Sequence, residues 1–168
     1  MRKLNILKAL INYFFAFTAL ATFGSLILVP IVLFSSEETL NFKVNGTLVD
    51  LSSLLGKVIL ALSTIGALIF LYSIYLLRKI INLFVKRDLF NIQISKSFSS
   101  IGKCIIVSPL LINVPIFFYN RRESFAIEFG NGGNYSLLYL ITLGLFFMVL
   151  SEVFTKAKNI KDENELTI

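Results

Sequence analysis

The sequence RKIINLFVKRDLFNIQISKSFSSIGK, residues 78–103, joins two long apolar runs and carries six of the sixteen Lys and Arg residues of the chain. In the whole chain, 56% of the 168 residues are hydrophobic and the mean hydropathy is +0.81. A soluble domain of this length does not bury so large an apolar share. The composition therefore indicates an integral membrane protein in which residues 78–103 connect two spans.

Four uncharged runs separate the charged residues. They hold 28 residues after Lys8, 20 after Lys57, 17 after Lys103 and 23 after Glu128. About 20 residues at about 1.5 Å each cross the hydrocarbon core, and the third run gains length from apolar residues on its N-terminal side. We therefore predict an all-α integral membrane protein with four transmembrane helices, a single membrane domain over residues 1–168.

The predicted domain divides into spans, loops and a tail. The spans cover residues 9–34, 56–80, 101–120 and 134–157, the loops cover 35–55, 81–100 and 121–133, and the tail covers 158–168. The first span has some features of a signal peptide, but its apolar run is far longer than the roughly 7–15 residues typical of one. We expect it to be retained as a span.

Basic residues concentrate on one side of the predicted membrane. Segments 1–8, 78–103 and 152–168 hold twelve Lys and Arg, whereas the other two connections hold four. Cytoplasmic loops carry an excess of Lys and Arg, so we predict a multi-pass protein of the cell inner (plasma) membrane with both termini in the cytoplasm. Six tyrosines predict an aromatic belt at each interface: Tyr13, Tyr72 and Tyr75 inside, and Tyr119, Tyr135 and Tyr139 outside.

Both outer loops have strand character. Residues 40–44 alternate apolar and polar side chains, Asn45-Gly46 is typical of a type I′ turn, and residues 47–51 can return as a second strand. Residues 124–129 are a further strand candidate. Because an isolated hairpin is marginally stable in water, we predict a small extracytoplasmic β-sheet from the two outer loops.

The cytoplasmic loop contains apolar side chains at helical spacing. They fall within an arc of about 80° at about 100° per residue: Phe90, Ile94, Phe98, Ile101 and Ile105. With Asp88 as the expected N-cap, the pattern predicts a cytoplasmic amphipathic helix between helices two and three, lying along the membrane surface. Such a helix either only positions the chain or offers a surface to lipid or to a partner.

The polar residue that stands out within the spans is Asn113, which lies between Pro109 and Pro115. An amide at membrane depth needs a partner or a water-lined cavity. A bridge between helices is the simpler interpretation. A path for a solute, lined by Asn113 and Ser108, is the alternative.

The residue content predicts neither catalysis nor a bound cofactor. With no His and a single cysteine, Cys104, the chain has no His or Cys cluster for a metal and no internal disulfide. The carboxylate clusters, Glu37-Glu38 and Asp162-Glu163-Glu165, lie in a loop and a tail without a histidine to act as base. We therefore expect no enzymatic activity, no catalytic residue, no metal and no cofactor.

Two cytoplasmic pieces of the chain resemble a known family. They are Asp88-Leu89-Phe90-Asn91 and Glu163-Asn164-Glu165-Leu166-Thr167-Ile168, the second preceded at compatible spacing by Glu152, Phe154 and Ile160. In these pieces and in its layout the chain is similar to the bacterial membrane proteins catalogued as domain-of-unknown-function family 2975. Two positions depart from the family pattern, since Ala157 stands where Gly is common and Leu89 where Pro often precedes the Phe.

The resemblance implies four spans and no particular biochemical activity. It also implies a partner, because family members are often encoded beside a small helix-turn-helix regulator. The residues expected to contact such a partner are Phe90, Asn91, Glu163, Asn164, Glu165, Leu166 and Thr167.

These observations favour a non-enzymatic regulatory or sensory membrane component that contacts a cytoplasmic partner. The alternative is a small transporter or channel subunit. The lipid bilayer is the other expected partner, direct binding of nucleic acid is not expected, and assembly into a homo-oligomer stays open.

Overall fold

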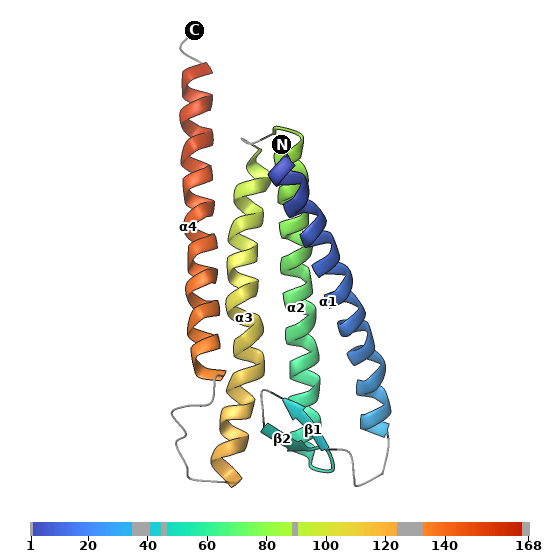
Figure 1. Ribbon diagram of the computed structural model, residues 1–168. Coiled ribbons are helices and arrows are strands. Elements are labelled where there is room, and N and C mark those ends of the chain that lie inside the picture. The colour runs from blue at the N-terminus through green and yellow to red at the C-terminus, as the bar shows by residue number, and fades with distance from the viewer. Residues whose placement is uncertain (1, 35–40, 45–46, 89–90, 124–132, 166–168) are drawn as a thin grey trace.

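A computed structural model of the protein describes residues 2–34, 41–44, 47–88, 91–123 and 133–165. These residues form four long helices and a two-stranded sheet (Figure 1): α1 (Arg2–Phe34), β1 (Asn41–Val44), β2 (Thr47–Asp50), α2 (Leu54–Val85), α3 (Ile92–Glu123) and α4 (Gly133–Glu165). Each of the four predicted spans lies within one of these helices.

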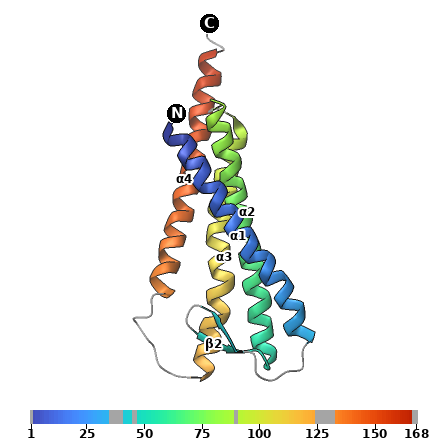
Figure 2. The ribbon, with the colours of Figure 1, turned by 45° about the vertical axis from the view of Figure 1, so that its right-hand side comes forward.

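The helices run alternately in opposite directions, and each packs on its neighbour in the chain. α3 lies between α2 and α4, and α1 packs on α2. One end of the bundle, here called the basic end, holds the N-terminus, the α2–α3 turn and the last turns of α4, whereas the β-hairpin lies at the opposite, hairpin end (Figures 1 and 2). α1 and α4 are thus the outer members of a row of helices.

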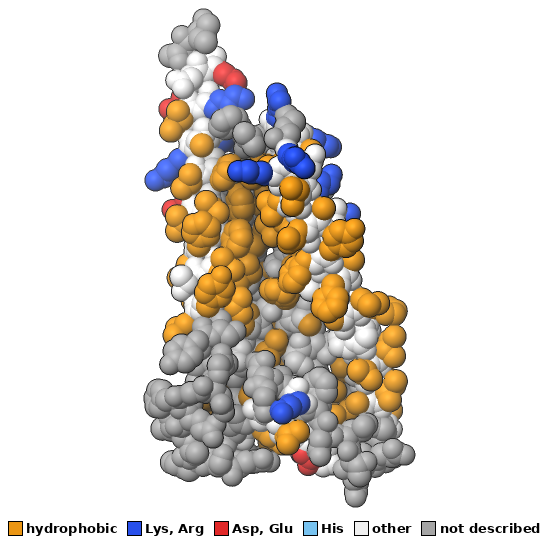
Figure 3. Space-filling model, in the orientation of Figure 1, with side chains coloured by type: hydrophobic (Ala, Val, Ile, Leu, Met, Phe, Trp, Pro, Cys, Tyr) orange, Lys and Arg blue, Asp and Glu red, His pale blue; other side chains and the backbone are white. Residues whose placement is uncertain are grey.

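All four described helices are long and apolar enough to cross a membrane. Large apolar side chains on the outer helices are exposed, among them Phe17 and Leu20 of α1 and Phe146 and Val149 of α4. Figure 3 shows an apolar band over the bundle below the basic end. Contiguous apolar surface of this extent is suited to lipid rather than to water, and the chain is a multi-pass membrane protein.

The connection between α2 and α3 is much shorter than the predicted loop of residues 81–100. α2 continues to Val85 and α3 begins at Ile92, so only residues 86–91 separate the two helices. The separate amphipathic helix is therefore wrong. Its predicted residues from Ile92 onward are the first turns of α3.

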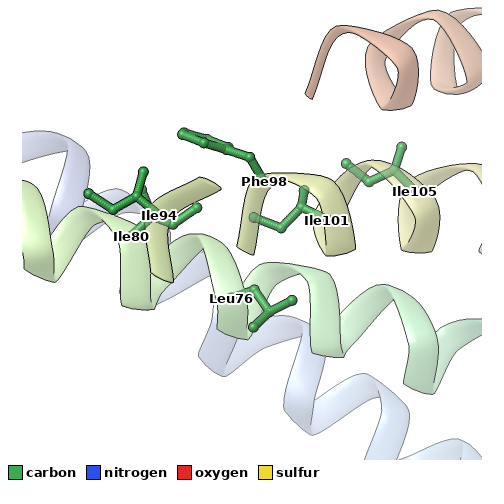
Figure 4. Close-up of a cluster of buried hydrophobic side chains, with 6 residues drawn as sticks. All are labelled: Leu76, Ile80, Ile94, Phe98, Ile101 and Ile105. Atoms are coloured by element: carbon green, nitrogen blue, oxygen red, sulfur yellow. The ribbon is translucent and has the colours of Figure 1, made fainter. Parts of the chain in front are cut away.

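The apolar stripe predicted for that helix is instead the centre of the bundle. Six buried side chains form this cluster (Figure 4): Leu76, Ile80, Ile94, Phe98, Ile101 and Ile105. Because α3 turns back directly against α2, the stripe faces α2 and α4 and not the membrane surface. In a bilayer such a core is held by close packing and dispersion more than by exclusion of water. Phe90, the first residue of the predicted stripe, lies outside the described residues.

The predicted hairpin is present. β1 pairs antiparallel with β2, in a register that places Phe42 opposite Val49 and Val44 opposite Thr47. The turn at residues 45–46 and the third strand predicted at residues 124–129 lie outside the described residues.

The hairpin is docked on the ends of α2 and α3. Val49 is buried against Ile59, Ile116 and Tyr119, and the Asp50 N–H donates a hydrogen bond of 3.1 Å to the Tyr119 hydroxyl. Tyr119, predicted for the outer aromatic belt, is therefore a buried anchor, because its ring and hydroxyl both contact the hairpin.

A glycine allows α2 to start close to the end of β2. The Ser53 hydroxyl accepts a hydrogen bond from the Gly56 N–H and donates one to the Asp50 carbonyl, as an N-cap does. A Cβ on Gly56 would lie 1.9 Å from the same carbonyl oxygen. The carboxylate of Asp50 accepts hydrogen bonds from the hydroxyl and the N–H of Ser52, which lower its pKa.

Candidate functional site

The basic end carries most of the described positive charges, and Figure 3 shows those on one face gathered above the apolar band. They come from all four helices and from the α2–α3 turn: Arg2, Lys3, Lys8, Arg78, Lys79, Lys86, Arg87, Lys96, Lys103, Lys156, Lys158 and Lys161. Of the partner-binding residues predicted from the sequence, the four that the structure describes belong to the same end: Asn91, Glu163, Asn164 and Glu165. It is therefore the candidate functional site.

α2 ends at this site in a tight, hydrogen-bonded turn. The Arg87 N–H donates to the Phe84 carbonyl and the Asp88 N–H to the Leu83 carbonyl, each at 3.1 Å, which is the pattern of a Schellman motif. Arg87 has a φ of 60°, in the left-handed region that glycine usually occupies at this position. The geometry directs the chain straight back along the bundle.

Asn91, one of the predicted partner-binding residues, caps α3. Its Oδ1 accepts a hydrogen bond of 2.9 Å from the Gln93 N–H, and its carbonyl accepts one from the Ile94 N–H. Its Nδ2 donates to Asp88 Oδ2 at 2.7 Å. Asp88 is therefore not the N-cap that we expected, because it belongs to the turn that ends α2 and holds the amide of the actual cap.

Three hydroxyl side chains, the hydroxyl cluster, join α3 to α4 below the turn. Ser95 Oγ donates to the Ser151 carbonyl at 2.9 Å, and Ser151 Oγ donates to the Ser95 carbonyl at 2.8 Å. Thr155 Oγ1 lies within hydrogen-bonding reach of Ser95 Oγ and of the Ser151 carbonyl. Such bonds between spans contribute about 0.6 to 2 kcal/mol each, so this cluster fixes α4 on α3.

A second close contact between α3 and α4 lies one heptad away from the hydroxyl cluster. A Cβ on Gly102 would lie 2.5 Å from the Gly144 carbonyl oxygen, and one on Gly144 would lie 2.8 Å from the Gly102 carbonyl oxygen. Ser95 and Gly102 are seven residues apart, as are Gly144 and Ser151. Small residues at heptad spacing on two spans are the signal that would have predicted this interface.

Phe154 is the apolar anchor of α4 at the basic end. Its ring centroid lies 5.3 Å from that of Phe98 on α3 and 5.9 Å from that of Phe84 on α2. Phe147, two turns earlier on α4, also stacks on Phe98, with ring centroids 5.9 Å apart. α4 is therefore held by α3, and near the turn also by Phe84 of α2, up to Phe154 and the hydroxyl cluster.

Beyond these contacts α4 continues as a charged helical segment, residues 156–165, here called the α4 arm. It projects past the α2–α3 turn (Figures 1 and 2), and every residue from 159 to 165 is exposed. Three predicted partner-binding residues lie in its last turn: Glu163, Asn164 and Glu165. Leu166 and Thr167 lie outside the described residues. The structure therefore does not bring the end of the arm together with Asn91 in the turn.

The residues considered for a solute path lie in the middle of α3. Asn113 is half-buried, and its Nδ2 donates a hydrogen bond of 2.8 Å to the Pro109 carbonyl of the same helix. Ser108 is buried, and its carbonyl oxygen would lie 3.0 Å from a Cβ on Gly66 of α2. At this depth α2 and α3 are closely packed.

Comparison with known proteins identifies the family. Residues 32–168 match the family model described as Protein of unknown function (DUF2975). The chain belongs to this family. The match extends from the last residues of α1 through the hairpin and the other three helices. No curated protein and no solved structure matches the chain.

The described part of this DUF2975 protein holds no group of three or more His, Cys, Asp or Glu side chains that could bind a metal ion. What its basic end presents is exposed charge of both signs, with cations on every helix and acidic residues on the α4 arm. Surfaces of this kind recognise charged partners by complementarity.

Proposed function

We propose that the protein is a non-enzymatic regulatory or sensory membrane component whose α4 arm contacts a soluble protein on the cytoplasmic side. The observation that carries the proposal is that the arm projects beyond the part of α4 that packs on α3 and on Phe84 of α2. At about 1.5 Å per residue, the ten residues of the arm reach about 15 Å past its last packed turn.

The surface of the arm fits a binding segment. A short helix exposed on all sides is only marginally stable in water by itself. Here the packed part of α4 precedes the arm and nucleates its helix. Ile160 lies near the middle of the arm and is 59% exposed. An apolar side chain among charged neighbours is the usual anchor of a helix that docks in a groove.

The charges at the end of the arm favour a basic partner. Asp162, Glu163 and Glu165 lie in the last turns of α4, where no basic residue occupies the final turn and Lys161, one turn earlier, pairs with Glu165 at 3.4 Å. The C-terminus of a helix carries partial negative charge, so these carboxylates and the helix dipole add up. A helix-turn-helix regulator presents a basic surface to DNA, and binding of the arm to that surface would compete with DNA.

We also propose that the protein lies in the plasma membrane. In the proposed orientation the basic end, with both termini, faces the cytoplasm and the hairpin lies outside the cell. The support is the bias of twelve Lys and Arg at the basic end against four elsewhere in the chain.

The test is binding of a helix-turn-helix regulator, of the kind often encoded beside genes of this family, to the full chain in mild detergent. Removal of residues 162–168 is expected to weaken binding about tenfold or more, since it deletes the acidic end. The double variant Glu163→Gln/Glu165→Gln keeps the length of the arm and tests the charge. Lys43→Gln at the hairpin end is the matched control, with unchanged affinity expected. Equal affinity of the intact and shortened chains would refute the role of the arm.

A small transporter or channel subunit is the second proposal. What favours it is the pair of prolines inside α3, Pro109 and Pro115, which leave the carbonyls of Ile105 and Leu111 without their helical N–H donors. Polar groups of this kind can line a path for a solute. Flux into proteoliposomes, with Asn113→Leu beside the native chain, tests it. Flux that the substitution does not change would count against Asn113 as part of a path.

A further inference from the structure

Arg78 is held over an aromatic ring at the boundary between the apolar band and the charged residues of the basic end. Its guanidinium carbon lies 5.5 Å from the centroid of the Phe15 ring, across the contact between α2 and α1. Twenty uncharged residues precede Arg78, so its position marks the level at which α2 leaves the hydrocarbon core. A guanidinium stacked on a ring keeps its in-plane N–H groups available to another ligand.

Two tyrosines continue this surface toward the apolar band. Phe15 packs against Tyr75, with ring centroids 6.5 Å apart, and Tyr75 stacks on Tyr72 at 6.3 Å. Tyr72 and Tyr75 are 52% and 50% exposed. Tyrosine at a membrane interface places its ring among acyl chains and its hydroxyl among headgroups. Together Phe15, Tyr72, Tyr75 and Arg78 form a continuous surface, here called the Arg78 strip.

No carboxylate on the same helices neutralises the strip. The described residues of α1 and α2 include no Asp or Glu, and Arg78 makes no ion pair within the described part of the chain. Two lysines add to its positive charge. Lys79 follows Arg78, and Lys8 lies seven residues before Phe15, on the same face of α1.

We infer that the Arg78 strip binds the headgroup of an anionic phospholipid. The guanidinium suits the phosphate, to which arginine donates two parallel hydrogen bonds. Lys8 and Lys79 attract a headgroup with net negative charge, whereas they repel the cationic group of a zwitterionic lipid. The bias of basic residues toward one side of a membrane accounts for an arginine at the end of a span. It does not require that the guanidinium stack on a ring of the neighbouring helix.

Lipid fits this position better than an acidic protein segment. The strip begins at exposed tyrosines of the apolar band and ends at a guanidinium at its edge. A ligand that covers the whole strip needs an acyl chain on one side and an anion on the other. A phospholipid has both.

Native mass spectrometry of the purified full chain, titrated with phosphatidylglycerol and separately with phosphatidylcholine, tests the inference. Phosphatidylglycerol is expected to bind more tightly. Arg78→Gln is expected to weaken its binding about fivefold, which corresponds to the loss of one basic contact with an anionic headgroup. Phe15→Leu keeps every charge and removes the ring below the guanidinium, and a loss of about twofold to threefold is expected.

The matched control is Arg87→Gln, which removes one positive charge from the α2–α3 turn at the same end. It is expected to change the affinity for phosphatidylglycerol by less than about twofold. Equal weakening by Arg78→Gln and Arg87→Gln would mean that charge alone attracts the lipid, and would overturn the site. Equal affinity for the two lipids would overturn it as well.

Two further measurements distinguish a bound lipid from a soluble anion and from a defect in folding. Excess inorganic phosphate is expected to leave the bound lipid in place, whereas displacement would assign the strip to a soluble anion and overturn the inference. Arg78→Lys covers the case in which Arg78→Gln does not fold. This variant keeps the charge and loses the planar fork of the guanidinium. An affinity for phosphatidylglycerol below that of the native chain supports the site, and an unchanged affinity contradicts it.

Discussion

Arg87 occupies a backbone conformation that costs an L-residue about 1 kcal/mol or more. Its φ of 60° is unique among the described residues other than glycine. Arg87→Gly should therefore stabilise the protein by about 0.5 to 1 kcal/mol, after the larger chain entropy of glycine in the unfolded state is subtracted. Denaturant unfolding in detergent measures this change. Lys86→Gly, at a residue with a φ of −75°, is the control, and we expect it to destabilise.

Asp50 links the stability of the hairpin end to pH. Hydrogen bonds from the Ser52 hydroxyl and then from its N–H lower the pKa of Asp50 from 3.8. The ionised carboxylate therefore stabilises the folded state above the unfolded pKa, and this contribution is lost as the pH falls through the folded pKa. Asp50→Asn should lower the Tm at neutral pH. The Tm of the native chain and that of the variant should approach each other as the pH falls below about 3.8. A difference in Tm that stays constant with pH would contradict the role of the charge.

The contact of α3 with α4 depends on glycine at the point where their backbones meet. A Cβ on Gly102 would approach both the Gly144 carbonyl and Met148 Cγ, the latter at 2.6 Å. Gly102→Ala should force the helices apart and cost about 1 to 3 kcal/mol. Unfolding by SDS titration measures it. Gly24→Ala is the control, because a Cβ there meets nothing within 4 Å, and we expect it to be neutral or slightly stabilising.

The helical period of residues 94–105 could be predicted from the sequence, but the surroundings of that face could not. Ile94 and Phe98 fall on one arc whether the helix lies on a membrane or within a bundle, because an apolar stripe satisfies both environments. The deciding feature is the turn before it. Arg87 closes that turn in a conformation usually reserved for glycine, so no glycine marks the point at which α2 ends and the chain reverses.

In the hairpin and at the α3–α4 interface, too, the local structure could be predicted from the sequence and the packing could not. Asn45-Gly46 between alternating residues is a local signal, and it predicted the paired strands correctly. Docking of the hairpin through Tyr119, 69 residues beyond Asp50 in the chain, has no local signal. The heptad of small residues from Ser95 to Gly102 is visible in the sequence, but it acquires meaning only once the matching heptad of α4 is placed opposite.

At the scale of the whole molecule, the spacing of the charged residues predicted the four helices, whereas packing decided how these helices are arranged. The gaps between charged residues located four helices that the structure contains. They did not indicate that α3 lies between α2 and α4, nor that α1 and α4 lie outermost. When apolar side chains cover every face of a helix in lipid, they do not indicate which face packs on a neighbouring helix. Small residues and buried hydroxyls indicate the packing face instead.

The proposed orientation of the bundle predicts which cysteine a membrane-impermeant maleimide reaches from outside the cell. In a Cys104→Ser background, Lys43→Cys reports the hairpin end and Lys86→Cys the basic end, and both native side chains are exposed. With the basic end in the cytoplasm, intact cells should label only Lys43→Cys, and permeabilised cells should label both variants. Labelling of Lys86→Cys alone in intact cells would reverse the orientation. The α4 arm would then lie outside the cell, out of reach of a cytoplasmic partner, whereas the Arg78 strip would still contact lipid, in the opposite leaflet.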